Sequence, residues 1–178
     1  MSLEQLLDSV ATARSRYIGD VQQLTEAQAR WKPDPDAWSA VDITEHLYWA
    51  EHGGIWGMWR ILQDKRDGKP PVWTGELIHR GLPIEEIVAR TWQVKEKVPP
   101  IAAPRMGGSV AFWLAALESL QQPLTKLSQE LADEDFEAII HPHPISGPLD
   151  VGQRFEFLRF HIDRHRNQVA ELRAQMPV

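Results

Sequence analysis

Apolar residues recur every three or four positions in four long stretches of the chain, and this spacing is typical of helices with one buried face. Two of the stretches open with a capping-box pattern, in which Ser2 or Asp150 precedes a glutamine by three residues. Ser39, with Asp42 three residues later, begins a third stretch. The four predicted helices span residues 2–24, 39–65, 110–131 and 150–174.

Prolines and glycines set the breaks in this pattern. Pro123 lies inside the third predicted helix, where we expect a kink or a break. The stretch 70–108 is irregular apart from one helix predicted from Pro83 to about Lys97, and the stretch 137–149 is expected to be extended. Four long amphipathic helices joined by one long crossover predict an all-α fold, an antiparallel four-helix bundle.

The composition narrows the class of protein. A length of 178 residues predicts a single domain over residues 1–178, and a net charge of −6 leaves no basic surface suited to nucleic acid. The chain has no apolar run of membrane-spanning length, and its first ten residues predict no cleaved leader. It also has no cysteine, which excludes disulfides and thiolate ligands. We therefore expect a cytoplasmic protein without nucleic-acid or membrane partners.

His161 and His165 are four positions apart in the fourth predicted helix, so their imidazoles share one face. His165 falls between Ile162 and Val169, where the apolar repeat calls for a core side chain. A buried imidazole needs a partner for each nitrogen. The residues alone leave two interpretations open: a metal ligand, or a core histidine bonded to a backbone carbonyl or a carboxylate.

Two motifs resemble those of the DinB-like metalloproteins. The motifs are Trp31-Lys-Pro33 with Asp36-Ala-Trp38-Ser39 and His46, and the segment from Phe157 to Gln168. The resemblance implies a four-helix bundle that binds a divalent metal, nickel or zinc, through three histidines, here His46, His161 and His165. His46 also borders the buried stripe of its own predicted helix, between Ile43 and Ala50.

The other histidines are interpreted without a metal. His52 points away from the apolar stripe and is expected to face solvent, and His79 lies in the crossover without a paired partner. His141 and His143 can share one side of an extended segment. A proline-rich loop with incidental histidines is nevertheless the favoured interpretation of that segment.

Two charged residues near the predicted core have more than one possible role. Asp42 lies one turn before His46 and can either accept the second N–H of that imidazole or cap its helix. Arg14 interrupts the apolar stripe of the first helix, so it must reach solvent, a carboxylate or an anionic ligand. Snorkelling to water or pairing within the protein is favoured. No carboxylate is an obvious general base.

Three neutral imidazoles leave positions open on a metal, which predicts a metal-dependent enzyme acting on a small molecule. Hydrolysis and the addition of a thiolate both fit such a metal, and the resemblance to the DinB-like proteins implies thiol-dependent transfer or isomerisation for the second. The thiol would be a low-molecular-weight molecule because the chain has no cysteine. The alternative is a non-catalytic metal-containing stress or small-molecule-binding protein. Trp56 and Trp59 lie in the second predicted helix, whose buried stripe already has enough apolar residues. Some of their aromatic surface is therefore expected to be exposed and to form a homodimer interface.

Overall fold

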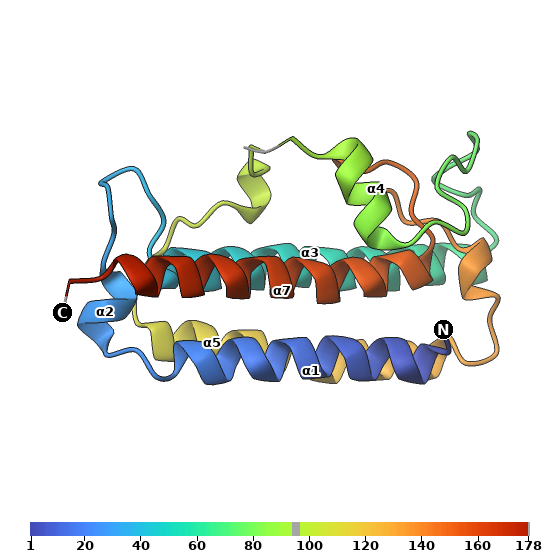
Figure 1. Ribbon diagram of the computed structural model, residues 1–178. Helices are drawn as coiled ribbons and strands as arrows, with labels where there is room; N and C mark the ends of the chain where they lie inside the picture. Colours follow the sequence, from blue (N-terminus) through green and yellow to red (C-terminus); the bar gives the residue numbers. More distant parts are fainter. Residues whose placement is uncertain (94–96, 178) are drawn as a thin grey trace.

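Four long helical segments pack side by side in the computed structural model, which describes residues 1–93 and 97–177. The segments are α1 (Leu3–Val21), α3 (Ala40–Arg66), α5 (Val110–Ser119) with α6 (Gln121–Glu130), and α7 (Val151–Gln175). In Figure 1, α3 and α7 form one layer and run in opposite directions, and α1 lies with α5 in the other. Strand pairing in the described residues is limited to two isolated bridges, so the all-α prediction is confirmed.

The predicted capping residues begin the long helices. Ser2, Ser39 and Asp150 each accept a hydrogen bond from a backbone N–H three residues later and complete a capping box. The apolar stripes meet in one large core that includes the fully buried Tyr17 and Phe155. None of the described helices is long and apolar enough to cross a membrane.

The third predicted helix is broken, but one turn before its proline. Helix α5 ends at Ser119, and α6 starts at Gln121 with Pro123 in its first turn. A proline ring clashes with the carbonyl four residues earlier and removes the N–H that would bond to it, and here that carbonyl belongs to Ser119. Within α6 the same proline is tolerated, because the first N–H groups of a helix have no intrahelical acceptor.

The long crossover contains helix α4 (Ile84–Thr91) and a 3₁₀ turn, η1 (Pro100–Ala102). The prediction of a helix from Pro83 to about Lys97 was therefore too long, and residues 94–96 lie outside the described residues. The helix ends because Trp92 adopts an extended backbone and donates its indole N–H to the hydroxyl of Ser146 at 2.9 Å.

Besides η1, sequence reasoning missed two short elements. Helix α2 (Glu26–Arg30) begins with a capping box of Thr25 and Gln28, a signal that was present in the sequence. A second 3₁₀ turn, η2 (Phe136–Ala138), precedes the last irregular stretch.

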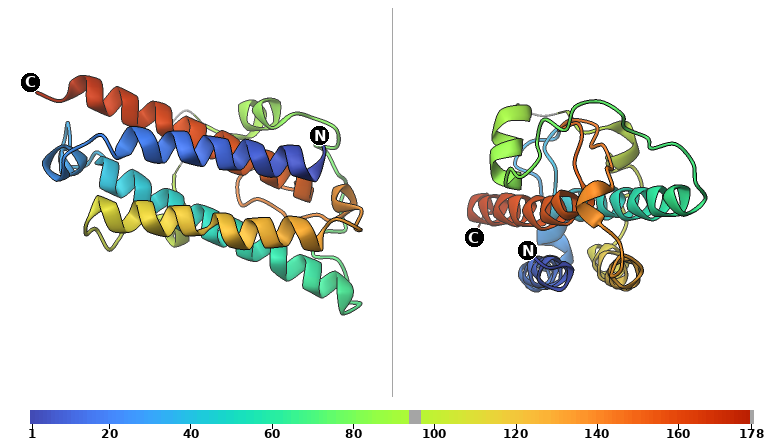
Figure 2. Two further views of the ribbon diagram at one scale, coloured as in Figure 1. Left: turned by 90° about the horizontal axis from the view of Figure 1, so that it is seen from below. Right: turned by 90° about the vertical axis from the view of Figure 1, so that its right-hand side faces the viewer.

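The stretch before α7 was expected to be extended, and it folds back on itself as a hairpin of residues 139–151. The backbone N–H of His141 donates to Leu149 at 2.8 Å, and that of His143 donates to Gly147 at 2.7 Å. Figure 2 shows the hairpin and α4 on the face of the α3–α7 layer opposite α1 and α5. The crossover and the hairpin thus cover the outer face of the two helices that carry the candidate histidines.

The two tryptophans behind the dimer prediction differ in exposure. Trp56 keeps 64% of its surface exposed, whereas Trp59 is half-buried and donates its indole N–H to the carbonyl of Pro123 at 3.1 Å. Exposed aromatic surface is therefore present on α3, and dimerisation stays a prediction.

Candidate metal centre

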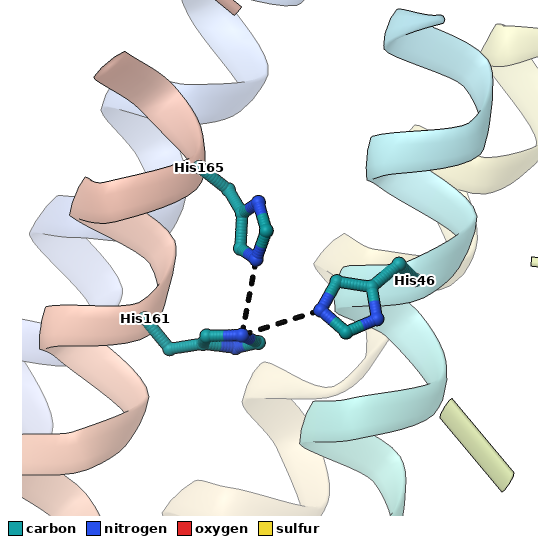
Figure 3. A group of neighbouring side chains, drawn as sticks. All are labelled: His46, His161 and His165. Carbon is teal, nitrogen blue, oxygen red and sulfur yellow. Dashed lines mark hydrogen bonds between the residues drawn. The ribbon is translucent and has the colours of Figure 1, made fainter. Parts of the chain in front are cut away.

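Three imidazoles from the α3–α7 layer meet in the interior (Figure 3). The Nε2 atom of His161 lies 3.3 Å from Nε2 of His46 and 3.1 Å from Nε2 of His165. The ligand atoms of all three residues lie within 4.8 Å of one another, and no side chain of the three is more than 7% exposed. The structure therefore brings together the three histidines that the sequence singled out.

Hydrogen bonds at the outer nitrogens determine which inner nitrogens carry a lone pair. Nδ1 of His46 donates to the carbonyl of Ala102 at 2.8 Å, and Nδ1 of His165 lies 2.8 Å from the amide oxygen of Gln168. Because these oxygens only accept, each Nδ1 holds the proton of the neutral ring. The Nε2 lone pairs of His46 and His165 consequently point at His161.

This arrangement fits a metal ion. Nε2 of His161 can offer a proton to only one of the two lone pairs, so the other faces it without a hydrogen bond. A cation among the three nitrogens satisfies all of them at once. In a tetrahedral site with metal–nitrogen bonds of about 2.0–2.1 Å, neighbouring nitrogens are about 3.3 Å apart, close to the two separations in the protein.

The electrostatic setting keeps the three imidazoles neutral. Burial lowers the pKa of His46 and His161, and it lowers the pKa of His165 to about 3, with neighbouring imidazoles and Arg164 adding to the effect on His161 and His165. No carboxylate of the described residues contributes to these shifts. Neutral imidazole is the form that binds a metal, so the site is ready at neutral pH.

Aromatic rings wall the site. Trp38 lies 5.0 Å from the ring of His46 and 6.5 Å from that of His165, and Phe157 stacks on His161 at 5.4 Å. Trp92 of the crossover meets the His161 ring edge-on at 6.3 Å. These apolar walls restrict the rotation of the imidazoles and exclude water around them.

Glu45 fixes the segment that supplies the carbonyl of Ala102, and sequence reasoning missed this role. Its fully buried carboxylate accepts hydrogen bonds from the backbone N–H groups of Arg105, Met106 and Gly107, each at 2.8 Å. Burial alone would raise the pKa of Glu45, but these backbone donors lower it. Glu45 therefore positions His46 through the crossover instead of acting as a base. No spacing rule connects residues that are 60 positions apart.

The structure decides between the two roles proposed for Asp42. Its carboxylate accepts the backbone N–H of Ser39 at 2.9 Å and pairs with Lys32 at 2.9 Å. Because the second nitrogen of His46 bonds to Ala102, Asp42 caps its helix and does not orient the imidazole.

The remaining histidines lie apart from the triad. His52 is exposed as expected, and Nε2 of His79 lies 2.7 Å from the carbonyl oxygen of Ser146. Nδ1 of His143 accepts the backbone N–H groups of Ile145 and Ser146. Among the described residues, the triad is the one group of three or more potential ligands close enough to share an ion.

Comparison with known proteins identifies the family of the chain. The sequence matches the DinB superfamily over residues 9–169. The chain belongs to the DinB superfamily. It is 25% identical over 167 residues to the uncharacterized protein YuaE of Bacillus subtilis (strain 168), covering 92% of this chain and 94% of YuaE.

A solved structure shares the fold of this DinB-superfamily chain. The crystal structure of a conserved protein from Enterococcus faecalis superposes with a TM-score of 0.59, covering 97% of this chain and 96% of that one. The two sequences are 13% identical, so this likeness concerns the fold alone. The chemistry must be argued from the site itself.

Proposed function

We propose that this protein binds one divalent metal ion, nickel or zinc, through Nε2 of His46, His161 and His165, and that it is a metal-dependent enzyme acting on a small molecule. The observation that carries the proposal is the convergence of the three Nε2 atoms at 3.1 and 3.3 Å, with the outer nitrogens of two rings bonded to oxygen acceptors. Three imidazoles with open positions are typical of catalytic rather than structural sites.

The residues around the triad have distinct tasks in this proposal. A divalent ion held by three neutral imidazoles keeps its full charge, so when bound it would supply Lewis-acid activation of a carbonyl, a water or a thiol. Ala102 and Gln168 hold two imidazoles in the tautomer that presents Nε2. Trp38, Phe157 and Trp92 keep the surroundings dry, which strengthens electrostatic interactions at the reacting atoms.

The surroundings favour thiol-dependent transfer over hydrolysis. Glu45 and Asp42, the two acidic residues nearest to His46 in sequence, are occupied by backbone donors and by Lys32. Attack by water usually needs a base, whereas a thiol ionises readily beside a positive charge. Because the chain has no cysteine, the thiol would be a separate low-molecular-weight molecule.

Metal analysis of the purified protein tests the site. We expect about one divalent ion per chain in the wild type and little or none in His165→Ala, because two imidazoles cannot fix the coordination geometry. His52→Ala removes an exposed histidine from α3 and should keep its metal. Stoichiometric metal in His165→Ala would overturn the proposed ligand set.

An activity screen tests the enzyme. The metal-loaded protein should catalyse the addition of a small thiol to an electrophile, and His165→Ala should lose this activity while His52→Ala keeps it. Hydrolysis of esters with no thiol requirement would reverse the preferred reaction class. Full metal occupancy without turnover in either assay would reject the enzyme in favour of a metal-containing binding protein.

A further inference from the structure

Arg154 is a buried cation without a counter-charge. It lies on α7, seven residues before His161, and only 5% of its surface is exposed. Among the described residues, its Nε and Nη1 atoms have no hydrogen-bond partner, and no carboxylate forms an ion pair with it. A buried guanidinium in this state is costly, so a partner from outside the chain would relieve a large desolvation penalty.

Contacts within the protein do not compensate this charge. The ring of Phe157 lies 5.5 Å from the guanidinium carbon, but a ring face leaves the N–H groups without acceptors. Burial is the one cause that shifts the pKa of Arg154, which it lowers to about 10; no acidic group opposes it. With 5% of the residue exposed, water cannot reach Nε and Nη1, which are buried.

His141 provides a second polar group at the same place. Its Nδ1 atom is buried and has no hydrogen-bond partner among the described residues. Burial, followed by the positive charge of Arg154, lowers the pKa of His141 to about 3, so the ring is neutral and one of its nitrogens carries a proton that it can donate. These two side chains with unpartnered nitrogens come from different segments, α7 and the hairpin, and they approach α3 one turn apart, at Gly54 and Gly57.

Two glycines of α3 leave room for these side chains. A Cβ atom at Gly54 would lie 3.0 Å from Nη2 of Arg154, and a Cβ atom at Gly57 would overlap the ring of His141. Glycine weakens a helix interior relative to alanine, so its presence here needs a packing reason. The approach of Arg154 and His141 to the helix supplies that reason.

We propose that Arg154 and His141 form a binding subsite for an oxyanion, the carboxylate or phosphate group of a small molecule. The guanidinium fork matches two oxygens of such a group, and a ring N–H of His141 adds a third donor. The subsite itself needs no metal. Its assignment to the substrate of the metal centre, as an anionic small molecule, rests on the proposed function.

The position of the subsite relative to the triad supports this assignment. Seven residues of helix place Arg154 about 10 Å from His161 along α7. The two are linked by packed rings, because His143 lies 4.3 Å from Phe157 and Phe157 stacks on His161. The hairpin that carries His141 and His143 covers the outer face of the α3–α7 layer (Figure 2), and the ring of His143 stacks on Trp92 at 5.9 Å. The subsite and the triad are thus about two helical turns apart on α7 and are joined by packed rings.

Anion titration of the metal-free protein tests the subsite with acetate and inorganic phosphate as probes. The Nε–H resonance of Arg154, assigned by its loss in Arg154→Met, should shift on titration and saturate. Calorimetry should show at least about tenfold weaker binding in Arg154→Met. Arg60→Met is the matched control, because Arg60 is a largely exposed arginine of α3. Its affinity for both probes should equal that of the wild type.

The possible outcomes separate this inference from the metal site. Tighter binding of acetate indicates a carboxylate ligand, and tighter binding of phosphate indicates a phosphorylated one. Equal affinity in Arg154→Met and the wild type would overturn the subsite, as would an Nε–H resonance that neither probe shifts. Since every titration is done without metal, a failure of metal binding does not affect the result.

Discussion

Two buried arginines of this protein differ in whether a carboxylate lies beside them. Arg14 of α1 is 2% exposed, and its Nη2 atom lies 2.6 Å from the carboxylate of Glu51 on α3. A second nitrogen of Arg14 donates to the side chain of Gln121. Arg154 of α7 is equally buried and has neither kind of partner among the described residues.

This difference separates a structural charge from one that is available to a ligand. Arg14 interrupts an apolar stripe and was expected to reach solvent or pair within the protein, and Glu51 provides that pair. Such a pair links two helices and balances the charge of Arg14, although Nε of Arg14 and Oε1 of Glu51 have no hydrogen-bond partner among the described residues. Arg154 keeps its hydrogen-bonding capacity, because no acidic side chain approaches it.

Breaking the first pair should have the largest effect on stability. Glu51→Gln leaves the guanidinium of Arg14 buried without a counter-charge, which should lower the free energy of unfolding by about 3–5 kcal/mol. Arg154→Met removes a buried charge without a counter-charge and leaves no partner unpaired, so it should keep or raise the free energy of unfolding. Urea unfolding at pH 7 measures both.

A double variant at Arg14 and Glu51 is the control for the predicted loss in Glu51→Gln. Replacing Arg14 by Met and Glu51 by Leu together should recover much of the loss, since apolar side chains of similar volume can replace a buried ion pair. If Arg154→Met instead destabilises the protein as much as Glu51→Gln, then Arg154 has an internal partner and the contrast between the two arginines is wrong.

Alanine substitutions at two glycines of α3 test whether His141 needs the space beside that helix. Gly57→Ala forces the ring of His141 to move and should destabilise the protein by about 1–3 kcal/mol. Gly53→Ala is the matched control, because nothing lies within 4 Å of its added Cβ atom. That variant should stabilise the protein by up to about 1 kcal/mol, the usual gain in a helix interior.

Thermal melts of the two alanine variants, with and without acetate, measure this difference. Gly57→Ala should also weaken oxyanion binding, whereas Gly53→Ala should not. Equal melting temperatures for the two variants would show that the space at Gly57 is not needed by His141.

Periodicity was enough to predict the elements that depend on local sequence. The long helices begin at the predicted caps because capping and apolar spacing act within a few residues. The i, i+4 spacing of His161 and His165 likewise placed two imidazoles on one face. The third histidine, His46, needed the family resemblance, because the pairing of α3 with α7 is not a local property.

Features that depend on contacts between distant segments could not be predicted. A charge beside an apolar stripe normally faces water, whereas Arg154 is buried, with Gly54 of α3 and the ring of Phe157 beside it. Glu45 bonds to backbone N–H groups of a crossover whose course no pattern defines. For the same reason the contact between His79 and the carbonyl of Ser146 could not be predicted.

The hairpin histidines provide the smallest predicted effect, a loss of stability in acid. Nδ1 of His143 accepts two backbone N–H groups, and burial, followed by the charges of Arg154 and His141, lowers its pKa to about 3. The unfolded chain takes up this proton near pH 6.5, whereas the folded protein resists it. Stability is therefore full above about pH 6.5 and falls as the pH decreases toward 3, by about 1–2 kcal/mol between pH 7 and 5 for this residue.

His143→Asn tests the assignment, since an asparagine oxygen can accept the same backbone N–H groups and does not titrate. Urea unfolding of the metal-free protein from pH 7 to 5 should show a shallower loss of stability in this variant, by up to about 1.4 kcal/mol per pH unit in the steepest part. The exposed His52 is the control, and His52→Asn should follow the wild-type curve. A His143→Asn curve parallel to that of the wild type would mean that His143 takes up its proton as easily in the folded protein as in the unfolded chain.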